Sequence, residues 1–132
     1  MRYQVIGLFD ALGEEGIGRP GDLIHFLGTE VQVNGFNQEE QREILVQLFK
    51  NTPWLTYRSG FPQLYHDLKG TYVTDTGWGC MIRVGQMALA QIMKRHLGVT
   101  SQERMNPIIE LFNDVDKNQP FSIHSISKMA WK

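Results

Sequence analysis

The sequence has a single cysteine, Cys80, in 132 residues, so no disulfide can form within the chain. It has no apolar run that approaches the roughly 20 residues of a membrane-spanning helix. The N-terminal stretch MRYQVIGLFDALGEE lacks the sustained apolar core of a signal peptide. The formal net charge is only −1, which gives no electrostatic reason to expect binding to nucleic acid or to an anionic membrane. Together these absences predict a cytoplasmic protein in a reducing compartment, without a transmembrane segment.

What is present is the composition of a folded domain, with 42% apolar and 20% charged residues. The length is enough for one compact domain. Around Gly28, residues 22–33 are rich in β-branched and apolar side chains and predict two short strands joined by a turn. Asn37 can cap a helix that continues to Lys50 and ends before Pro53.

The second half of the chain predicts three further helices. The first begins at Cys80 and ends in a basic last turn before Gly98. Asn106 and Pro107 are expected to open the next helix, and Ser122 to cap the last one. This half of the chain is therefore expected to be mainly helical.

Two stretches between these helices carry no regular pattern. Residues 54–64 are aromatic and irregular, and residues 70–78 are expected to form a loop. Gly85 lies inside the helix that starts at Cys80, where glycine costs about 1 kcal/mol relative to alanine. We therefore expect another helix or strand to cross closely at Gly85.

Two motifs raise the question of a nucleotide or a metal. Residues 16–21 match G-x-G-x-x-G, but Pro20 blocks the helix that a nucleotide site needs there, so a flexible loop is expected. Residues 114–118, DVDKN, resemble the opening of a calcium loop, but Gln119 stands where glycine is required, so a solvated turn is expected. The four histidines have no metal-ligand spacing with Cys80. We therefore expect neither a metal nor a cofactor.

The segment DTGWGC, residues 75–80, places the one thiol at the start of a predicted helix. Free cysteine is among the residue types most often buried, so the simplest interpretation is a small core side chain. Its position argues for a nucleophile, because the free N–H groups and positive dipole at a helix N-terminus favour a thiolate. Gly77 and Gly79 would allow a sharp turn and leave space for a substrate chain.

Three blocks of sequence are more specific: WLTYRSGFPQL (54–64), YVTDTGWGCMIRVGQMALAQ (72–91) and FSIHSISKMA (121–130). In this order they resemble the N-terminal part of the autophagins, the autophagy-related cysteine peptidases. The resemblance covers residues 54–130 and is densest in DTGWGCMIRVGQM. It implies an α+β fold, in which this chain is the helical N-terminal portion of a papain-like cysteine peptidase and is incomplete.

The resemblance also implies a function. Autophagins cut a ubiquitin-like autophagy modifier after its C-terminal glycine, and they release the same modifier from phosphatidylethanolamine. By this resemblance Cys80 is the nucleophile, Tyr57 helps to form the oxyanion hole beside the backbone N–H of Cys80, and Trp78 shapes the substrate cleft. Asp75 and Arg83 match motif positions for which we expect local structure only, with Asp75 bonding its own backbone.

The departure from the family concerns the rest of the catalytic triad. In autophagins the histidine base and the orienting aspartate lie in an Asp-Pro-His motif, which this sequence does not contain. His124 matches a family position that is not the catalytic base. A histidine partner lowers the pKa of a papain-type thiol from about 8.5 to about 3–4, roughly 7 kcal/mol, whereas a helix dipole supplies about 2 kcal/mol at most. We therefore expect the base and the aspartate to be absent, and this chain alone to be a poor protease.

We accordingly divide the chain into a variable N-terminal segment with short strands, residues 1–36, and a nucleophile-bearing, truncated helical part, residues 37–132. Truncation would expose an apolar helix face, which favours aggregation or partner binding. The expected face consists of Met81, Ile82, Met87, Leu89 and Ile92. Two other interpretations stay open: a module that binds the modifier without catalysis, and a fragment without function.

Overall fold

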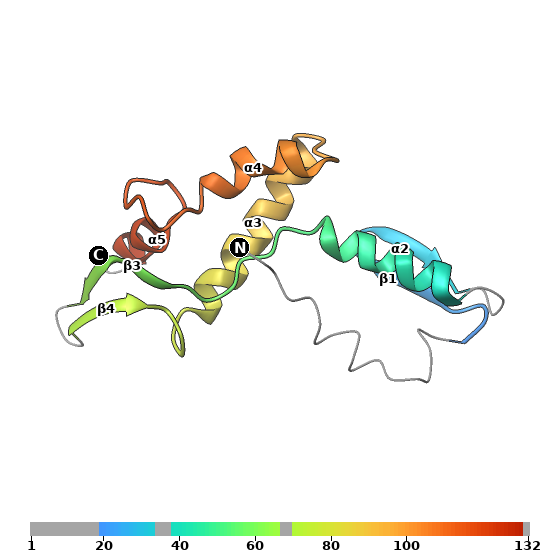
Figure 1. The fold of residues 1–132 in the computed structure, drawn as a ribbon, viewed down its shortest axis with the longest axis horizontal. Helices are drawn as coiled ribbons and strands as arrows, with labels where there is room; N and C mark the ends of the chain where they lie inside the picture. Colours follow the sequence, from blue (N-terminus) through green and yellow to red (C-terminus); the bar gives the residue numbers. More distant parts are fainter. Residues whose placement is uncertain (1–18, 34–37, 67–69, 131–132) are drawn as a thin grey trace. The chain divides into compact units, whose positions relative to one another are not determined.

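The computed structural model describes residues 19–33, 38–66 and 70–130, drawn in colour in Figure 1. Within these residues the chain forms two small antiparallel sheets and four helices, which confirms the expected mixed α+β class. The chain divides into two compact units, Met1–Lys50 and Asn51–Lys132. In chain order the elements are β1 (Leu23–Phe26), β2 (Thr29–Gln32), α2 (Gln38–Lys50), β3 (Ser59–His66), β4 (Gly70–Thr74), α3 (Cys80–His96), α4 (Gln102–Glu110) and α5 (Ile123–Ala130).

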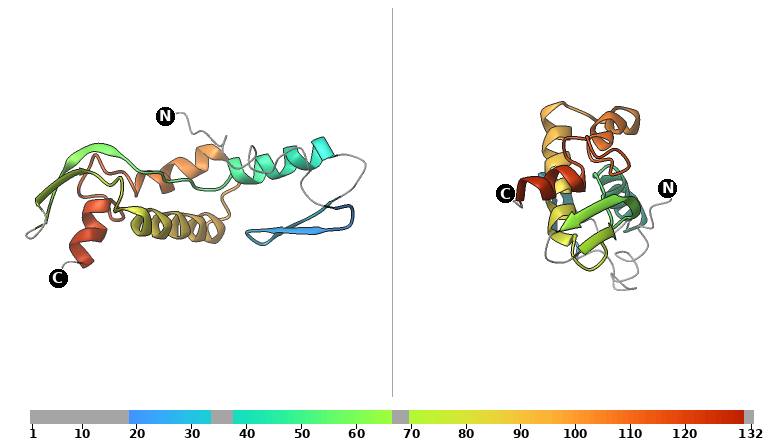
Figure 2. Two further views of the ribbon diagram at one scale, coloured as in Figure 1. Left: turned by 90° about the horizontal axis from the view of Figure 1, so that it is seen from below. Right: turned by 90° about the vertical axis from the view of Figure 1, so that its left-hand side faces the viewer.

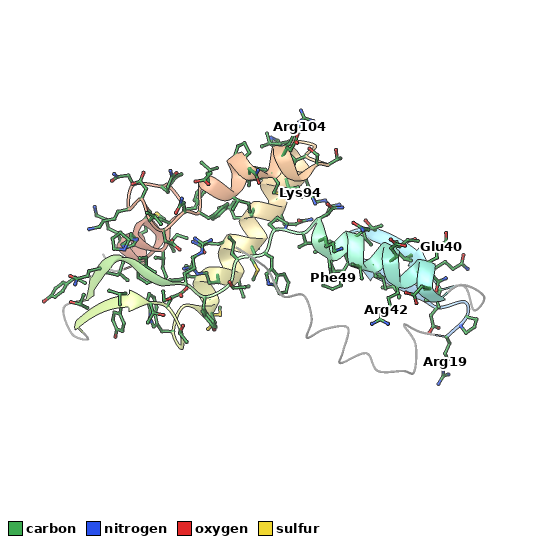
Figure 3. All side chains as sticks on the ribbon, in the orientation of Figure 1. Arg19, Glu40, Arg42, Phe49, Lys94 and Arg104 are labelled. Atoms are coloured by element: carbon green, nitrogen blue, oxygen red, sulfur yellow. The ribbon has the colours of Figure 1, made fainter. Side chains whose placement is uncertain are left out.

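The first unit holds one hairpin and one helix. Strands β1 and β2 pair antiparallel across a turn at Leu27 and Gly28, whose φ angles are 47° and 83°. The rings of Phe26 and Phe49 join β1 to α2 with their centroids 4.5 Å apart, and Figure 3 labels Phe49 near the end of α2. The two predicted strands and the predicted helix are confirmed, while Asn37, the expected cap, lies outside the described residues.

In the second unit, helix α3 joins two hydrophobic clusters. The first, here the Leu55 cluster, consists of Leu55, Ala90, Val99, Met105, Ile108 and Phe112 and covers the C-terminal half of α3. In the second, here the Phe61 cluster, Phe61 and Leu64 of β3 pack with Ile123 of α5, and Ile82 of α3 lies against them. Helix α4 therefore lies beside the C-terminal half of α3, and α5 lies against the β3–β4 hairpin (Figures 1 and 2).

Residues 51–58 run along α3 and lead into β3. Leu55 is buried in the Leu55 cluster. Lys94, labelled on α3 in Figure 3, donates a hydrogen bond from its ammonium group to the backbone carbonyl of Asn51. At the other end of the segment, the backbone of Arg58 is hydrogen-bonded to Asp75. This part of the chain is thus tied to α3 at one end and to the turn before α3 at the other.

The β3–β4 hairpin corrects two predictions, because residues 54–64 are not wholly irregular and residues 70–78 are not wholly loop. Leu64 pairs with Tyr72, but the register shifts between Ser59 and Leu64, so that β3 carries a bulge. Gly60 in this bulge has a φ of 76°. A bulge breaks the strict alternation by which strands are found in a sequence. Strand β4 could have been predicted from the stretch TYVT, because threonine, tyrosine and valine are enriched in strands.

Helix α4 begins earlier than predicted. Its first residue is Gln102 and Pro107 lies inside it, so the prediction that Asn106 and Pro107 open this helix is wrong. Proline in a helix interior removes one N–H donor and is unfavourable. Met105 and Ile108, both buried in the Leu55 cluster, supply the packing that holds the helix across Pro107.

Helices α3 and α5 agree with their predictions. Helix α3 begins at Cys80, and the chain leaves it through Gly98, which has a φ of 60°. Helix α5 begins after Ser122, whose Oγ accepts a hydrogen bond from the backbone N–H of Ser125 at 3.2 Å. This is the N-cap contact that the sequence indicated.

The exposed face of α3 differs from the expected one. Met81 and Ile92 are exposed, as predicted, whereas Ile82 packs on the Phe61 cluster, and Met87 and Leu89 pack on the Leu55 cluster. The prediction of a close crossing at Gly85 is wrong, because a Cβ added there would meet no atom within 4 Å.

Because Gly85 has open space around it, Gly85→Ala is expected to stabilise the second unit by about 0.5–1 kcal/mol through higher helix propensity. Urea unfolding followed by circular dichroism measures the change. Gly77→Ala is the matched control: its added Cβ also meets nothing within 4 Å, but its φ is +87°. That control is expected to lose about 1–2 kcal/mol. A lower stability of Gly85→Ala would mean that a partner occupies the face of α3 that carries Gly85.

Candidate active site

Cys80 is the first residue of α3, and its side chain is exposed. Gly79 occupies the N-cap position, no side chain caps the helix, and the first turn contains no acidic residue. The free N–H groups at a helix N-terminus carry a partial positive charge. Here that charge stands beside the thiol and no side chain caps the helix, which is an arrangement that stabilises negative charge on the sulfur or on a bound oxyanion.

Gly77 and Gly79, which precede Cys80, are required for different structural reasons. Gly77 adopts a φ of 87°, which gives the sharp turn that was predicted. Gly79 has an ordinary φ of −83°. A Cβ on Gly79 would lie 2.6 Å from the Cβ of Asp75 and 2.9 Å from its Oδ2. Gly79 is therefore required because the side chain of Asp75 packs directly against it.

Tyr57 lies beside Cys80. The Cys80 side chain is close enough to the phenol to raise its pKa, and Tyr57 is half exposed, at 48%. Partial desolvation raises the pKa of Tyr57, and the neighbouring Cys80 and Asp75 raise it further. Tyr57 therefore stays a neutral O–H donor across the pH range in which enzymes work, close to the Cys80 side chain.

The raised pKa of Tyr57 gives a test by alkaline titration. Tyr57 is expected to ionise above pH 10, later than an ordinary tyrosine. In Cys80→Ala its pKa is expected to fall but to stay raised, because desolvation remains. Tyrosinate absorbance, with Tyr57→Phe subtracted, reports this one group. Since the folded state favours the neutral phenol, its stabilisation is complete below about pH 10 and is lost as the pH rises through the raised pKa. An unchanged titration in Cys80→Ala would show that the two side chains do not interact.

Trp78 is turned toward the β3–β4 hairpin. Its indole N–H donates to the backbone carbonyl of Thr74 at 2.8 Å, and its ring packs on Tyr72 with centroids 5.3 Å apart. The ring is partly buried against the Phe61 cluster. A contribution of Trp78 to a substrate cleft stays a prediction.

Asp75 is fully buried, at 0% exposure. The prediction that its carboxylate bonds its own backbone is wrong, because both carboxylate oxygens bond to other residues. Its Oδ1 accepts the backbone N–H of Arg58 at 2.6 Å, and its Oδ2 accepts Nε–H of Arg83 at 2.5 Å. Its backbone carbonyl accepts the N–H groups of Trp78 and Gly79. Asp75 thus connects the residue after Tyr57, the turn before Cys80 and the first turn of α3.

Asp114 forms the other half of this buried network. Its Oδ2 lies 2.8 Å from Nη2 of Arg83 and 2.9 Å from Nη1 of Arg58, and its Oδ1 accepts the backbone N–H of Ile123 at 2.7 Å. Asp114 is only 2% exposed, so the prediction of a solvated turn is wrong for this residue. Neither Arg58 nor Asp114 could be assigned to this network from the sequence, because their partners in the network are far away along the chain.

The histidines and the acidic residues assemble no metal site in the part of the chain that the structure describes. His124 is buried, with Nε2 2.5 Å from the carbonyl oxygen of Pro62 and its ring edge-on to Phe61. It is thus occupied in packing α5 on β3. Among the described helices, none is long and apolar enough to cross a membrane.

Comparison with known proteins agrees with this geometry. The profile of the peptidase C54 catalytic domain matches residues 42–132. The chain belongs to the peptidase C54 family. Its C54 relatives include "Cysteine protease atg4da" of Danio rerio, 50% identical over 62 residues, which cover 47% of this chain and 12% of that protein. "Cysteine protease ATG4B" of Gallus gallus is 38% identical over 100 residues, covering 69% of this chain and 24% of that protein.

A plant C54 relative extends the match. "Cysteine protease ATG4A" of Oryza sativa subsp. indica is 34% identical over 109 residues, which cover 76% of this chain and 22% of that protein. The names of these relatives place the family among the autophagins, whose motifs the sequence resembles. This C54 chain spans at most 24% of the length of these three relatives. No solved structure gives a significant match.

Proposed function

We propose that this chain carries the nucleophile of a cysteine endopeptidase that cuts a ubiquitin-like autophagy modifier after its C-terminal glycine. The same activity would release the modifier from phosphatidylethanolamine, and it would act in the cytoplasm without a cofactor. The observation that carries the proposal is the exposed thiol of Cys80 at the start of α3, where no side chain caps the helix and the phenol of Tyr57 lies close by. We assign this role to the helical part, residues 37–132, with residues 1–36 as a variable segment.

The proposed chemistry follows from these groups. The Cys80 thiolate attacks the glycyl carbonyl carbon, a C–S bond forms, and the carbonyl electron pair moves to oxygen. The Tyr57 O–H and the Cys80 N–H donate to this oxyanion. The intermediate collapses to a thioester as the C–N bond breaks, the leaving amine takes a proton, and water then hydrolyses the thioester. In autophagins the proton comes from the histidine of Asp-Pro-His, which this sequence does not contain.

The experiment separates nucleophilic attack from protonation of the leaving group. Two substrates are prepared from a modifier that ends in glycine. One carries its C-terminal reporter as a phenyl ester and the other carries it as an amide. A phenolate leaves without a general acid, whereas an amine needs one. The chain is expected to release about one equivalent of the phenol in a burst and to form a thioester on Cys80, while it leaves the amide intact. Release that persists in Cys80→Ala would overturn the proposal, and so would the absence of a burst.

A second function has one observation in its favour. Met81, beside Cys80, is 78% exposed, and Ile92 on the same helix is 63% exposed, so this flank of α3 offers apolar surface to a partner. With no Asp-Pro-His in the sequence, the chain could bind the modifier without cutting it. Binding that survives in Cys80→Ala, together with no burst in the unmodified chain, would select this alternative.

A further inference from the structure

Asp75 has no solvent-exposed surface. Its hydrogen bonds nevertheless join residues next to Tyr57 and next to Cys80, the two residues that the proposed chemistry uses. On one side its Oδ1 holds the backbone N–H of Arg58 at 2.6 Å, and its own N–H donates to the Arg58 carbonyl at 3.2 Å. Two reciprocal bonds therefore fix the residue next to Tyr57. The hydroxyl of Thr74 adds a third bond to the same Arg58 carbonyl, at 3.1 Å.

On its other side Asp75 fixes the start of α3. Its carbonyl oxygen accepts the N–H of Gly79 at 2.8 Å, and its carboxylate holds Arg83, three residues after Cys80. Its side chain also fills the space that a Cβ on Gly79 would need. The position of the thiol is thereby set by the same residue that sets the backbone beside Tyr57.

The remaining contacts keep Asp75 itself from moving. Arg83 donates through Nη1 to Oε1 of Gln86 at 2.8 Å and pairs with Asp114. Gln86 in turn donates to the carbonyl of Phe121 at 2.7 Å. The carboxylate of Asp75 therefore sits in a buried frame of hydrogen bonds and ion pairs, which is the condition for placing a catalytic pair accurately.

We propose that Asp75 is the positioning residue of the Tyr57–Cys80 pair, setting the place of the phenol hydroxyl relative to the thiol and to the first N–H groups of α3. This inference rests on the proposed function and assigns to Asp75 a role beyond local structure. It requires Asp75 to act through Tyr57, so its effect should depend on whether the phenol hydroxyl is present. A residue that only stabilises the fold would show no such dependence.

The first test is a double-mutant cycle with the phenyl ester of the modifier. Asp75→Asn keeps the size of the side chain and removes its charge. It is expected to slow the acylation burst about 100-fold, as a displacement of about 1 Å can. In the Tyr57→Phe background the same substitution is expected to change the rate less than about 3-fold. An equal loss in both backgrounds would overturn the proposal.

Two controls separate positioning from general damage. Iodoacetamide modifies the single thiol without forming an oxyanion, so its rate with Asp75→Asn should stay within about 3-fold of the unmodified chain. Tyr65→Phe, 66% exposed on β3, leaves Asp75 and its bonds to Arg58 in place, and its acylation should also stay within about 3-fold. If Asp75→Asn fails to fold by circular dichroism, Gly79→Ala replaces it, because its Cβ would displace Asp75 with the charge retained.

A second readout needs no acylation. The titration of Tyr57 responds to Cys80 only while the two side chains remain together. If Asp75 positions them, Cys80→Ala should no longer shift the Tyr57 titration in the Asp75→Asn background. A shift that persists there would overturn the positioning role. Absence of the Cys80-dependent burst in the unmodified chain would instead overturn the proposed function, so the two failures are distinguishable.

Discussion

Replacing Asp114 by alanine is expected to lower the free energy of unfolding of the second unit by about 3–5 kcal/mol. The carboxylate is 2% exposed and accepts contacts from three directions: both arginines, Arg58 and Arg83, and the backbone N–H of Ile123. Without it, the Arg58 guanidinium would lose its carboxylate partner, Arg83 would keep only Asp75, and a buried N–H would lose its acceptor. Urea unfolding followed by circular dichroism measures the loss.

The loop that contains Asp114 also offers its control. Asp116 lies two residues on, is exposed, and accepts one local hydrogen bond from the backbone N–H of Asn118 at 2.9 Å. Asp116→Ala is expected to change stability by no more than about 0.5 kcal/mol. Asp114→Asn keeps an oxygen acceptor without the charge and should fall between the two. Equal effects at positions 114 and 116 would show that the buried network does not stabilise this unit.

The parts of the fold that could be predicted are those with local signals. The thiol at the start of α3, the glycine after its end and the cap of α5 are each defined within a few neighbouring residues. The Leu27–Gly28 turn between β1 and β2 is equally local. In each case the residues that determine the structure are adjacent in the sequence, and pattern rules apply directly.

The buried network could not be predicted because its contacts are not local. Arg58 reaches Asp75 across 17 positions and Asp114 across 56, so no spacing rule connects them. From the sequence alone Asp114 belongs to a polar turn, DVDKN, and only the fold brings two arginines to it. The bulge in β3 and the packing that holds α4 across Pro107 are likewise decided by tertiary contacts. The sequence therefore predicted Cys80 as the nucleophile, whereas the frame that would position it required the structure.

Replacing Tyr57 by phenylalanine is expected to slow acylation of Cys80 by the phenyl ester about 100- to 1,000-fold, the usual effect of removing one oxyanion donor. The substitution deletes a single hydroxyl, the one that lies beside the Cys80 side chain. Because the ring remains, contacts of the neighbouring residues should be kept. Stopped-flow release of the phenol measures the rate, and urea unfolding checks that stability changes by less than about 1 kcal/mol.

The comparison with alkylation decides what the Tyr57 hydroxyl does. If it stabilises the oxyanion, iodoacetamide should react with Tyr57→Phe within about 3-fold of the unmodified rate, since that reaction forms no oxyanion. If the hydroxyl instead activates the sulfur directly, both rates should fall together. Tyr65→Phe is the matched control, because Tyr65 is 66% exposed on β3 and should leave both rates unchanged. A parallel fall in acylation and alkylation would assign Tyr57 to the thiol rather than to the carbonyl oxygen, and the free N–H groups of α3 would then be the oxyanion donors that remain.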